Sequence, residues 1–252
     1  MTSLDYNDIA NMFDRRYELY DYPGIQKCLR EFISGSTRPR VLEIGCGTGK
    51  WLALLVSAGC EVAGIERSEQ MLVLAQSRVI GDLRIGTAED LPWHDASFDR
   101  VVYINVLHHL TDPAQALRES FRVLRPGGAL LSVGLDPHHR TGRWYIYDYF
   151  PRTLDIDLGR FPSCEQRTFW LLDAGFIDVV VSVAEHLQFA RSFHEAVQDG
   201  VLDRSFTSQL GLLSPDEYEA GMHRIRESSL RKEQPTLDVD LELYATKASK
   251  PL

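Results

Sequence analysis

The stretch VLEIGCGTG, residues 41–49, decides the fold of this chain. An apolar run typical of a buried strand ends in three glycines at alternate positions, and a helical pattern follows. Glycine has no Cβ and tolerates positive φ, so such a loop lets backbone approach a ligand closely. The N-terminus of the next helix offers unpaired N–H groups to a negatively charged group. The stretch therefore predicts a strand–loop–helix unit that binds a ligand.

The spacing of the glycines separates two classes of ligand. The dinucleotide fingerprint GxGxxG has its third glycine five positions after the first, and Lys50 stands there in this chain. An acid, Glu43, precedes the loop, and a second acid, Glu66, ends the next predicted strand. A carboxylate at that place can accept both ribose hydroxyls of NAD or of any adenosyl ligand. The pattern weakens the NAD interpretation and leaves it as the rival.

Short apolar runs alternate with amphipathic stretches after the loop. We predict strands at 41–44, 61–66, 83–88, 98–105, 129–135, 176–184 and 237–246, and helices at 49–58, at 68–78 and from Thr111 or Asp112 onward. This alternation indicates right-handed βαβ units and a parallel sheet. Residues 3–35 predict two helices, residues 185–236 are expected to be mainly helical, and the chain beyond about Lys247 is expected to be frayed.

Bulk properties exclude several classes of protein. The formal net charge of the 252 residues is −9, which disfavours a nucleic-acid partner. The four cysteines form no CxxC pair, so neither a zinc site nor a disulfide framework is expected. The N-terminal residues are polar where a signal peptide would be apolar, and no apolar run is long enough to span a bilayer. We expect a cytoplasmic protein with no membrane partner.

Five segments together resemble the class I S-adenosylmethionine-dependent methyltransferases, in the style of the methyltransferase type 11 and ubiquinone/menaquinone C-methyltransferase group. They occur in the family's order within residues 41–136 and read VLEIGCGTG, GIERSEQML, GTAEDLPW, SFDRVVYINVLHHLTDP and RVLRPGGALL. The resemblance implies a Rossmann-like α/β sheet of seven strands, in the order 3-2-1-4-5-7-6 with strand 7 antiparallel. It also implies a helical N-terminal lid and helical insertions after strands 5 and 6.

The resemblance further implies a single domain, 1–252. Within it, residues 1–39 would form the N-terminal helices or lid, residues 40–136 the cofactor-binding core, and residues 137–175 and 185–236 insertions that cap the substrate.

Roles in binding S-adenosylmethionine follow from the same resemblance. The loop would pass under the amino-acid part of the cofactor, Glu43 would hold its amino group, and Glu66 its ribose. Where relatives carry an Asp that meets the adenine edge, this chain has Thr87, so Ala88 or Glu89 would supply that contact. The residues implied to bind the cofactor are Tyr17, Glu43, Gly45, Cys46, Gly47, Gly49, Glu66, Arg67, Met71, Thr87, Ala88, Glu89, Asn105 and Val106.

The candidates for catalysis are histidines after predicted strands. Methyl transfer from a sulfonium needs positioning of the acceptor, and a base only where the acceptor must lose a proton. His139 follows strand 5 and is the preferred base, while His109 follows strand 4 and matches a histidine that often has a structural role in the family. The plain alternative for each is a loop residue. No metal is expected.

The acceptor is expected to be a small molecule that is methylated on oxygen or carbon. Aromatic residues at 144–150 and 189–206 suit an apolar pocket, although they also suit the packing of a helical insertion. Two alternatives to a methyltransferase remain open, an NAD(P)-dependent oxidoreductase and a non-catalytic scaffold with a methyltransferase fold. The oligomeric state is left open.

Overall fold

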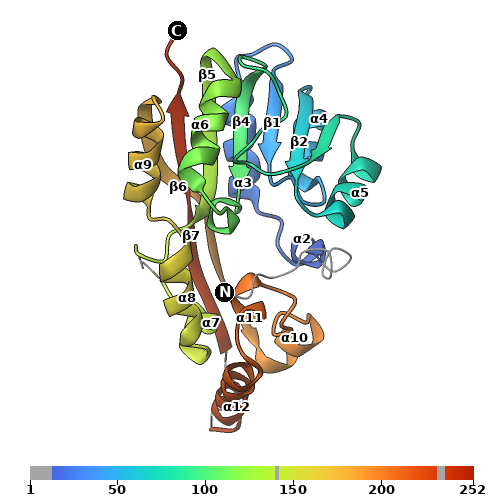
Figure 1. Ribbon diagram of the computed structural model, residues 1–252. Helices are drawn as coiled ribbons and strands as arrows, with labels where there is room; N and C mark the ends of the chain where they lie inside the picture. Colours follow the sequence, from blue (N-terminus) through green and yellow to red (C-terminus); the bar gives the residue numbers. More distant parts are fainter. Residues whose placement is uncertain (1–12, 140–141, 232–235) are drawn as a thin grey trace. The chain divides into compact units, whose positions relative to one another are not determined.

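The computed structural model describes residues 13–139, 142–231 and 236–252, which form two compact units (Figure 1). We call the first the sheet unit; it comprises Tyr22–Asp136, Pro162–Glu185 and Leu243–Leu252. We call the second the helical unit; it comprises the described residues of Met1–Asp21, Pro137–Phe161 and His186–Glu242. Three separate stretches of chain therefore build each unit.

The seven-stranded sheet has the order β3-β2-β1-β4-β5-β7-β6. Strands β1 to β5 run parallel to one another, and β7 runs antiparallel to β5. The predicted order and the reversed last strand are confirmed. The strands are β1 (Arg40–Ile44), β2 (Glu61–Glu66), β3 (Asp82–Ile85), β4 (Phe98–Ile104), β5 (Leu124–Leu135), β6 (Ile177–Ser192) and β7 (Thr236–Ser249).

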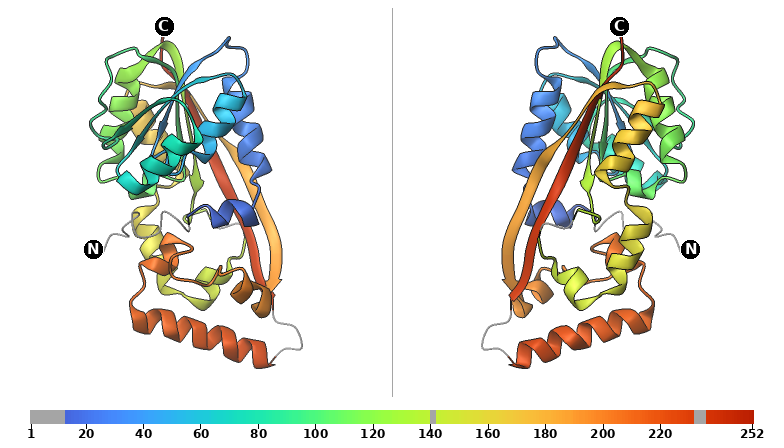
Figure 2. Two further views of the ribbon diagram at one scale, coloured as in Figure 1. Left: turned by 90° about the vertical axis from the view of Figure 1, so that its right-hand side faces the viewer. Right: turned by 90° about the vertical axis from the view of Figure 1, so that its left-hand side faces the viewer.

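Helices cover both faces of the sheet in the sheet unit. Helix α3 (Pro23–Ile33) lies on one face, and α6 (Pro113–Val123) and α9 (Cys164–Asp173) lie on the opposite face (Figure 2). Helices α4 (Lys50–Ser57) and α5 (Glu69–Arg78) follow β1 and β2. Ser68 caps α5 through the Met71 N–H, as predicted, and Asp112 caps α6.

The hydrophobic core of the sheet unit lies between the strands and α6 with α9. Its members are fully or almost fully buried and include Leu42, Val101, Tyr103, Leu117 and Leu171. The Tyr103 hydroxyl is satisfied by a hydrogen bond with the Ser120 hydroxyl, 2.6 Å away. This packing fixes the carboxyl ends of β1 and β4, which lead into the glycine loop and toward His109.

Among its described residues, the helical unit contains one helix that precedes β1 and five that follow strands β5 and β6. They are α2 (Arg15–Leu19), α7 (Tyr145–Tyr149), α8 (Arg152–Arg160), α10 (Phe193–Gln198), α11 (Ser208–Gly211) and α12 (Pro215–Arg231). A fully buried carboxylate, Asp157, accepts hydrogen bonds from Tyr147, Gln209 and Arg160. Burial raises the pKa of this carboxyl, and its three donors satisfy it.

The sequence misjudged four boundaries, the first being the start of β5, which lies at Leu124 instead of residue 129. Strand β3 ends at Ile85 because Thr87 pairs with Asp90 in a tight bridge. Strand β6 continues to Ser192 instead of ending at Ala184, so the insertion begins with extended chain. The C-terminus is not frayed, since β7 reaches Ser249 and the Lys250 ammonium donates to the carbonyls of Phe121 and Leu124 at the end of α6.

Candidate functional site

The glycine loop after β1 adopts a backbone that only glycine tolerates well. Gly45, Gly47 and Gly49 have φ of +63°, +52° and +79°. A Cβ on Gly45 would lie 2.3 Å from Cγ2 of Val106, and one on Gly49 would lie 3.1 Å from Ala75 of α5. The loop is therefore held between the end of β4 and helix α5, with its backbone close to both.

Glu66, at the end of β2, is tied to this loop. Its Oε2 accepts the Gly47 N–H at 3.0 Å, and its Oε1 accepts the N–H groups of Arg67 and Ser68 at 2.9 and 3.0 Å. Three backbone donors orient the carboxylate without using all of its lone pairs. The acid predicted to bind a ribose is thus preorganised beside the loop.

Glu43 is the buried acid at the base of the loop. Only 1% of the residue is exposed, and burial, reinforced by the charge of Glu66, raises the pKa of its carboxyl well above 4.5. It accepts a hydrogen bond from the Leu52 N–H, but within the described residues its Oε2 has no partner. A buried oxygen without a donor is costly, so this one fits the ammonium group of an amino-acid ligand.

The neighbouring cysteine has no nucleophilic role that the structure supports. Cys46 is buried, and the burial, with the charges of Glu43 and Glu66, raises the pKa of its thiol well above 9.0. The thiol therefore stays protonated at neutral pH. Its backbone serves the loop, because its N–H donates to Ile65 and its carbonyl accepts from Gly49.

The residues predicted to flank adenine differ in exposure. Arg67 and Thr87 are exposed, whereas Met71 and Ala88 are buried, with 1% and 4% of their surface accessible. The bridge between Thr87 and Asp90 keeps this segment in a tight turn at the end of β3. Arg67, Met71 and the Thr87–Ala88 turn all follow the carboxyl ends of β2 and β3, which lie in that order on one side of β1. Their contact with adenine stays a prediction.

Glu89, the other candidate for the adenine edge, makes a different contact in the structure. Its Oε1 accepts the N–H groups of Thr111 and Asp112 at 3.0 and 3.2 Å, where α6 begins. The Gln115 amide donates to the Glu89 carbonyl. The segment after β3 is thereby attached to the start of α6.

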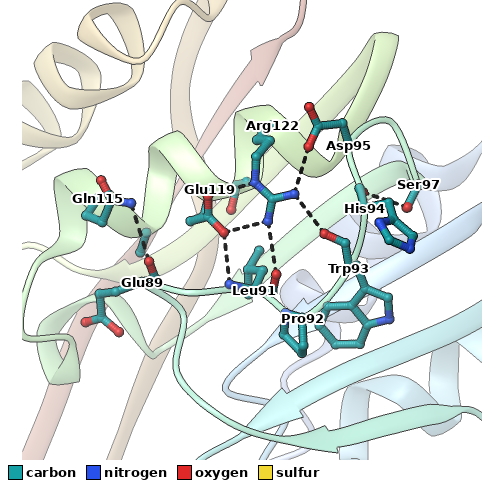
Figure 3. A network of polar contacts seen from close by, with 12 residues as sticks. Glu89, Leu91, Pro92, Trp93, His94, Asp95, Ser97, Gln115, Glu119 and Arg122 are labelled. Atoms are coloured by element: carbon teal, nitrogen blue, oxygen red, sulfur yellow. Dashed lines mark hydrogen bonds and ion pairs between the residues drawn. The ribbon is translucent and has the colours of Figure 1, made fainter.

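A second network, which the sequence did not reveal, fixes the same segment farther along (Figure 3). The Arg122 guanidinium donates to the carbonyls of Leu91 and Trp93, and it pairs with Asp95 and Glu119. Glu119 also accepts the Leu91 N–H at 2.9 Å. The Arg122 hydrogen bond lowers the pKa of the Glu119 carboxyl, so the pair stays ionised. Partners about thirty residues apart leave no local pattern to recognise.

The end of β4 brings three predicted residues together, Asn105, Val106 and His109. Asn105 has a φ of +54°, and its N–H donates to Val133 of β5 at 2.8 Å. Val106 packs against Gly45 of the loop, and its carbonyl accepts the His109 N–H. The rings of His108 and His109 lie 3.9 Å apart in a short 3-10 helix, η1 (Leu107–His109), and both are half-buried.

Two predicted site residues, Tyr17 and His139, belong to the helical unit. Tyr17 lies on α2, half-buried, with its ring edge-on to Phe13 at 6.2 Å. His139 is exposed in the bend after β5, beside His138, whose Nε2 lies 3.1 Å from the Phe161 carbonyl. Their predicted roles stay predictions.

The aromatic segment at 144–150 is largely core of the helical unit. Tyr145, Tyr147 and Phe150 are buried, and the Tyr147 hydroxyl is bonded to Asp157. Packing, the alternative given above, therefore accounts for these three. Trp144 and Tyr149 are half-buried.

The second aromatic segment contributes a stacked pair. The rings of Tyr20 and Phe189 lie 4.9 Å apart, and the Arg191 guanidinium lies within 5.4 Å of both ring centres. Arg191 is also paired with Asp199. Burial raises the pKa of the Tyr20 hydroxyl, so it stays protonated at neutral pH.

The described part of the chain offers neither a metal-binding cluster nor a membrane-spanning helix. No cluster of three or more His, Cys, Asp and Glu side chains in that part of the chain could hold a metal ion. No helix within it is long and apolar enough to cross a membrane.

Comparison with known proteins gives a consistent result. The sequence model of a family described as a methyltransferase domain matches residues 42–132. The demethylmenaquinone methyltransferase of Clavibacter sepedonicus is 31% identical over 207 residues, which are 70% of this chain and 82% of the relative. The malonyl-[acyl-carrier protein] O-methyltransferase of Erwinia billingiae is 33% identical over 234 residues, which are 83% of this chain and 90% of the relative.

Solved structures share the fold. A putative methyltransferase from an antibiotic biosynthesis pathway of Anabaena variabilis has a TM-score of 0.69 at 21% identity, covering 89% of this chain and 96% of that one. A possible histamine N-methyltransferase from Thermotoga maritima has a TM-score of 0.62 at 21% identity, covering 97% and 98%.

Proposed function

Since the chain belongs to the class I S-adenosylmethionine-dependent methyltransferases, we propose that it methylates a small molecule on oxygen or carbon. Bound S-adenosylmethionine supplies a sulfonium methyl group; the acceptor's electron pair forms the new bond to that carbon, and the electrons of the broken C–S bond go to sulfur, giving S-adenosylhomocysteine.

One observation carries the proposal for the cofactor site. The Glu43 carboxyl is buried at the base of the glycine loop with an oxygen that no described residue pairs. An ammonium group that enters there would satisfy that oxygen and stabilise its ionised form. A ribose diol offers two hydroxyl donors, and the two oxygens of the Glu66 carboxylate, which the Gly47 N–H holds in place, can accept both. An amino acid linked to a nucleoside fits this pair of acids.

The remaining residues would bind and orient. We propose that Gly45, Gly47 and Gly49 admit the amino-acid part, with Cys46 contributing its backbone. Asn105 and Val106 would line the side nearest the sulfonium. Arg67, Met71, Thr87, Ala88 and Glu89 would surround the adenine, and Tyr17 would contact the cofactor from α2. Because the displacement itself needs no Lewis acid, we propose that no metal is required, and turnover should survive EDTA.

Removal of the acceptor's proton is the one step that needs a base. Where the acceptor is a hydroxyl or an acidic carbon, we propose that His139 takes the proton, with His109 as the second candidate. Both rings are partly or fully accessible in the structure.

The acceptor class is supported by the relatives and by charge. One relative is named for a quinone-type acceptor and another for an acyl-group acceptor, methylated on oxygen. The net charge of −9 disfavours nucleic acid. We propose that residues of the helical unit select the acceptor, so that substitutions there change acceptor preference at constant cofactor affinity.

Isothermal titration tests which cofactor the protein binds, and a turnover assay tests whether it transfers a methyl group. S-adenosylhomocysteine should bind, and NAD(H) should not; the reverse would establish the oxidoreductase alternative. Labelled S-adenosylmethionine should then transfer its methyl group to at least one member of a panel of small quinones, phenols and carboxylic acids. Tight cofactor binding with no transfer across a broad panel would favour the non-catalytic scaffold.

A further inference from the structure

The last residue of α5 reaches back to the centre of the glycine loop. Nη1 of Arg78 donates to both the carbonyl oxygen and the hydroxyl oxygen of Thr48, at 3.0 Å each. Thr48 is 1% exposed and stands between Gly47 and Gly49, both with positive φ. A charged donor thus fixes the one non-glycine residue in the second half of the loop.

Helix α5 supports the loop in two further ways. Gly49 packs against Ala75, which lies about one turn before Arg78. A Cβ added to Gly49 would lie only 3.1 Å from atoms of Ala75. At the other end of the helix, Glu66 accepts the Ser68 N–H and the Gly47 N–H together. The helix therefore touches the loop at its start, through Glu66, and at its last turn, through Ala75 and Arg78.

An arginine at a helix C-terminus has a plain structural explanation, since a cation there interacts favourably with the helix dipole. The guanidinium could satisfy that interaction while pointing into solvent. Here it instead meets a buried residue thirty positions earlier in the chain. The helix dipole does not explain why the Arg78 side chain points at the loop, nor why it donates to two oxygens of Thr48.

We propose that Arg78 is a positioning residue that holds the glycine loop in its binding conformation; this rests on the proposed function. Because glycine has the greatest backbone freedom, a loop with three glycines has many conformations besides the one that binds the cofactor. Fixing the Thr48 peptide oxygen sets the plane of the Thr48–Gly49 peptide, and with it the direction of the Gly49 N–H. Arg78 acts on cofactor binding before chemistry, so its loss raises KM and leaves kcat almost unchanged.

The test compares three variants. Arg78→Met keeps the length of the side chain and removes the donors, and it should weaken binding of S-adenosylhomocysteine about tenfold, the scale of a charge-assisted hydrogen bond. Arg78→Lys retains one charged donor and should recover part of that loss. Arg118→Met is the matched control on α6, where the guanidinium is 47% exposed and 3.8 Å from Asp173; it should bind like the wild type.

Amide hydrogen exchange separates this proposal from the function on which it rests. In Arg78→Met the amides of residues 47–50 should exchange faster than in the wild type, with or without ligand, while the amides of β4 should not. If the wild type binds no S-adenosylhomocysteine, the proposed function fails, and the exchange result still decides whether Arg78 holds the loop. Wild-type affinity and wild-type exchange in Arg78→Met would overturn the proposal, as would a lower melting temperature with neither change.

Discussion

The Val106 side chain occupies the space that a side chain on Gly45 would need. Its Cγ2 lies 2.3 Å from the position of a Cβ on that glycine, far inside van der Waals contact. The loop after β1 and the turn after β4 are therefore packed without a gap, which makes their two conformations dependent on each other.

Gly45→Ala should consequently lose cofactor binding. A left-handed φ costs a non-glycine residue about 1–2 kcal/mol, and relief of the overlap must displace Val106. We expect the affinity for S-adenosylhomocysteine to fall more than tenfold in titration. Gly159→Ala is the control, because its Cβ would meet nothing within 4 Å. Equal affinity in Gly45→Ala and the wild type would contradict the close packing.

Glu66→Ala should weaken S-adenosylhomocysteine binding by roughly 1–3 kcal/mol, the cost of losing charge-assisted hydrogen bonds to a ribose. It also leaves the Gly47 N–H without its acceptor. Glu69→Ala, an exposed acid in the first turn of α5, is the control and should bind normally. Titration of both variants decides the matter, and no loss in Glu66→Ala would remove this acid from the ribose role.

The buried Glu43 carboxyl should make stability depend on pH. Its pKa in the folded chain lies well above the ordinary 4.5, so the folded state holds its proton over a range where the unfolded state has lost it. The free energy of unfolding should therefore fall as pH rises from about 4.5 to the raised pKa, and then level off. Glu43→Gln stays neutral and should lack this decline.

Thermal melts of wild type and Glu43→Gln across pH 4.5–9 measure the effect. The melting temperature of the Gln variant should gain on that of the wild type as pH rises, although its affinity for S-adenosylhomocysteine should be lower. A constant difference between the two curves would mean that Glu43 does not carry a raised pKa.

His139→Ala should reduce turnover on an acceptor that must lose a proton, by roughly 10²–10⁴-fold, the usual contribution of a general base. Affinity for S-adenosylhomocysteine should stay nearly unchanged, the pattern of a group that acts in the transition state. His138→Ala is the neighbouring control. Normal turnover in His139→Ala would make it an ordinary loop residue, and His109→Ala would then be examined in the same assay.

Lys250→Met should destabilise the fold by about 1–2 kcal/mol. The ammonium donates to the carbonyls of Phe121 and Leu124 at the end of α6, and the last carbonyls of a helix have no partner within the helix. Chemical denaturation measures the change, with Lys27→Met as the control because that side chain is 76% exposed. An unchanged midpoint would show that solvent replaces the lysine without cost.

The sequence predicted the sheet well where burial dictates the pattern. Strands β1 and β2 were placed within one residue, since each is a short apolar run between turn-forming residues. The predicted end of strand β6 at Ala184 is wrong, and residues 186–192, which contain no β-branched residue and carry polar groups, do not by themselves indicate a strand. Their extended form comes from pairing with β7, a partner remote in sequence.

The candidate site also has a part that the sequence predicts and a part that it does not. Glu43, Glu66 and the three glycines were recognised because motif spacing places them on one strand edge. The bond from Arg78 to Thr48 and that from Glu89 to Thr111 were missed, since each joins residues more than twenty positions apart. Such contacts depend on how helices pack against the sheet, which no local pattern encodes.

The place of β7 in the sheet bears on how the protein is made. Strand β7 follows β5 and β6 in the chain but is inserted between them in the sheet. Strands β1 to β5 can pair during translation, whereas β6 must wait for its neighbour. The Lys250 ammonium, just after β7, then bonds to the end of α6, which is synthesised more than a hundred residues before it. Loss of β7 would thus leave a chain in which β1 to β5 and the glycine loop can form while the sheet stays open at β5.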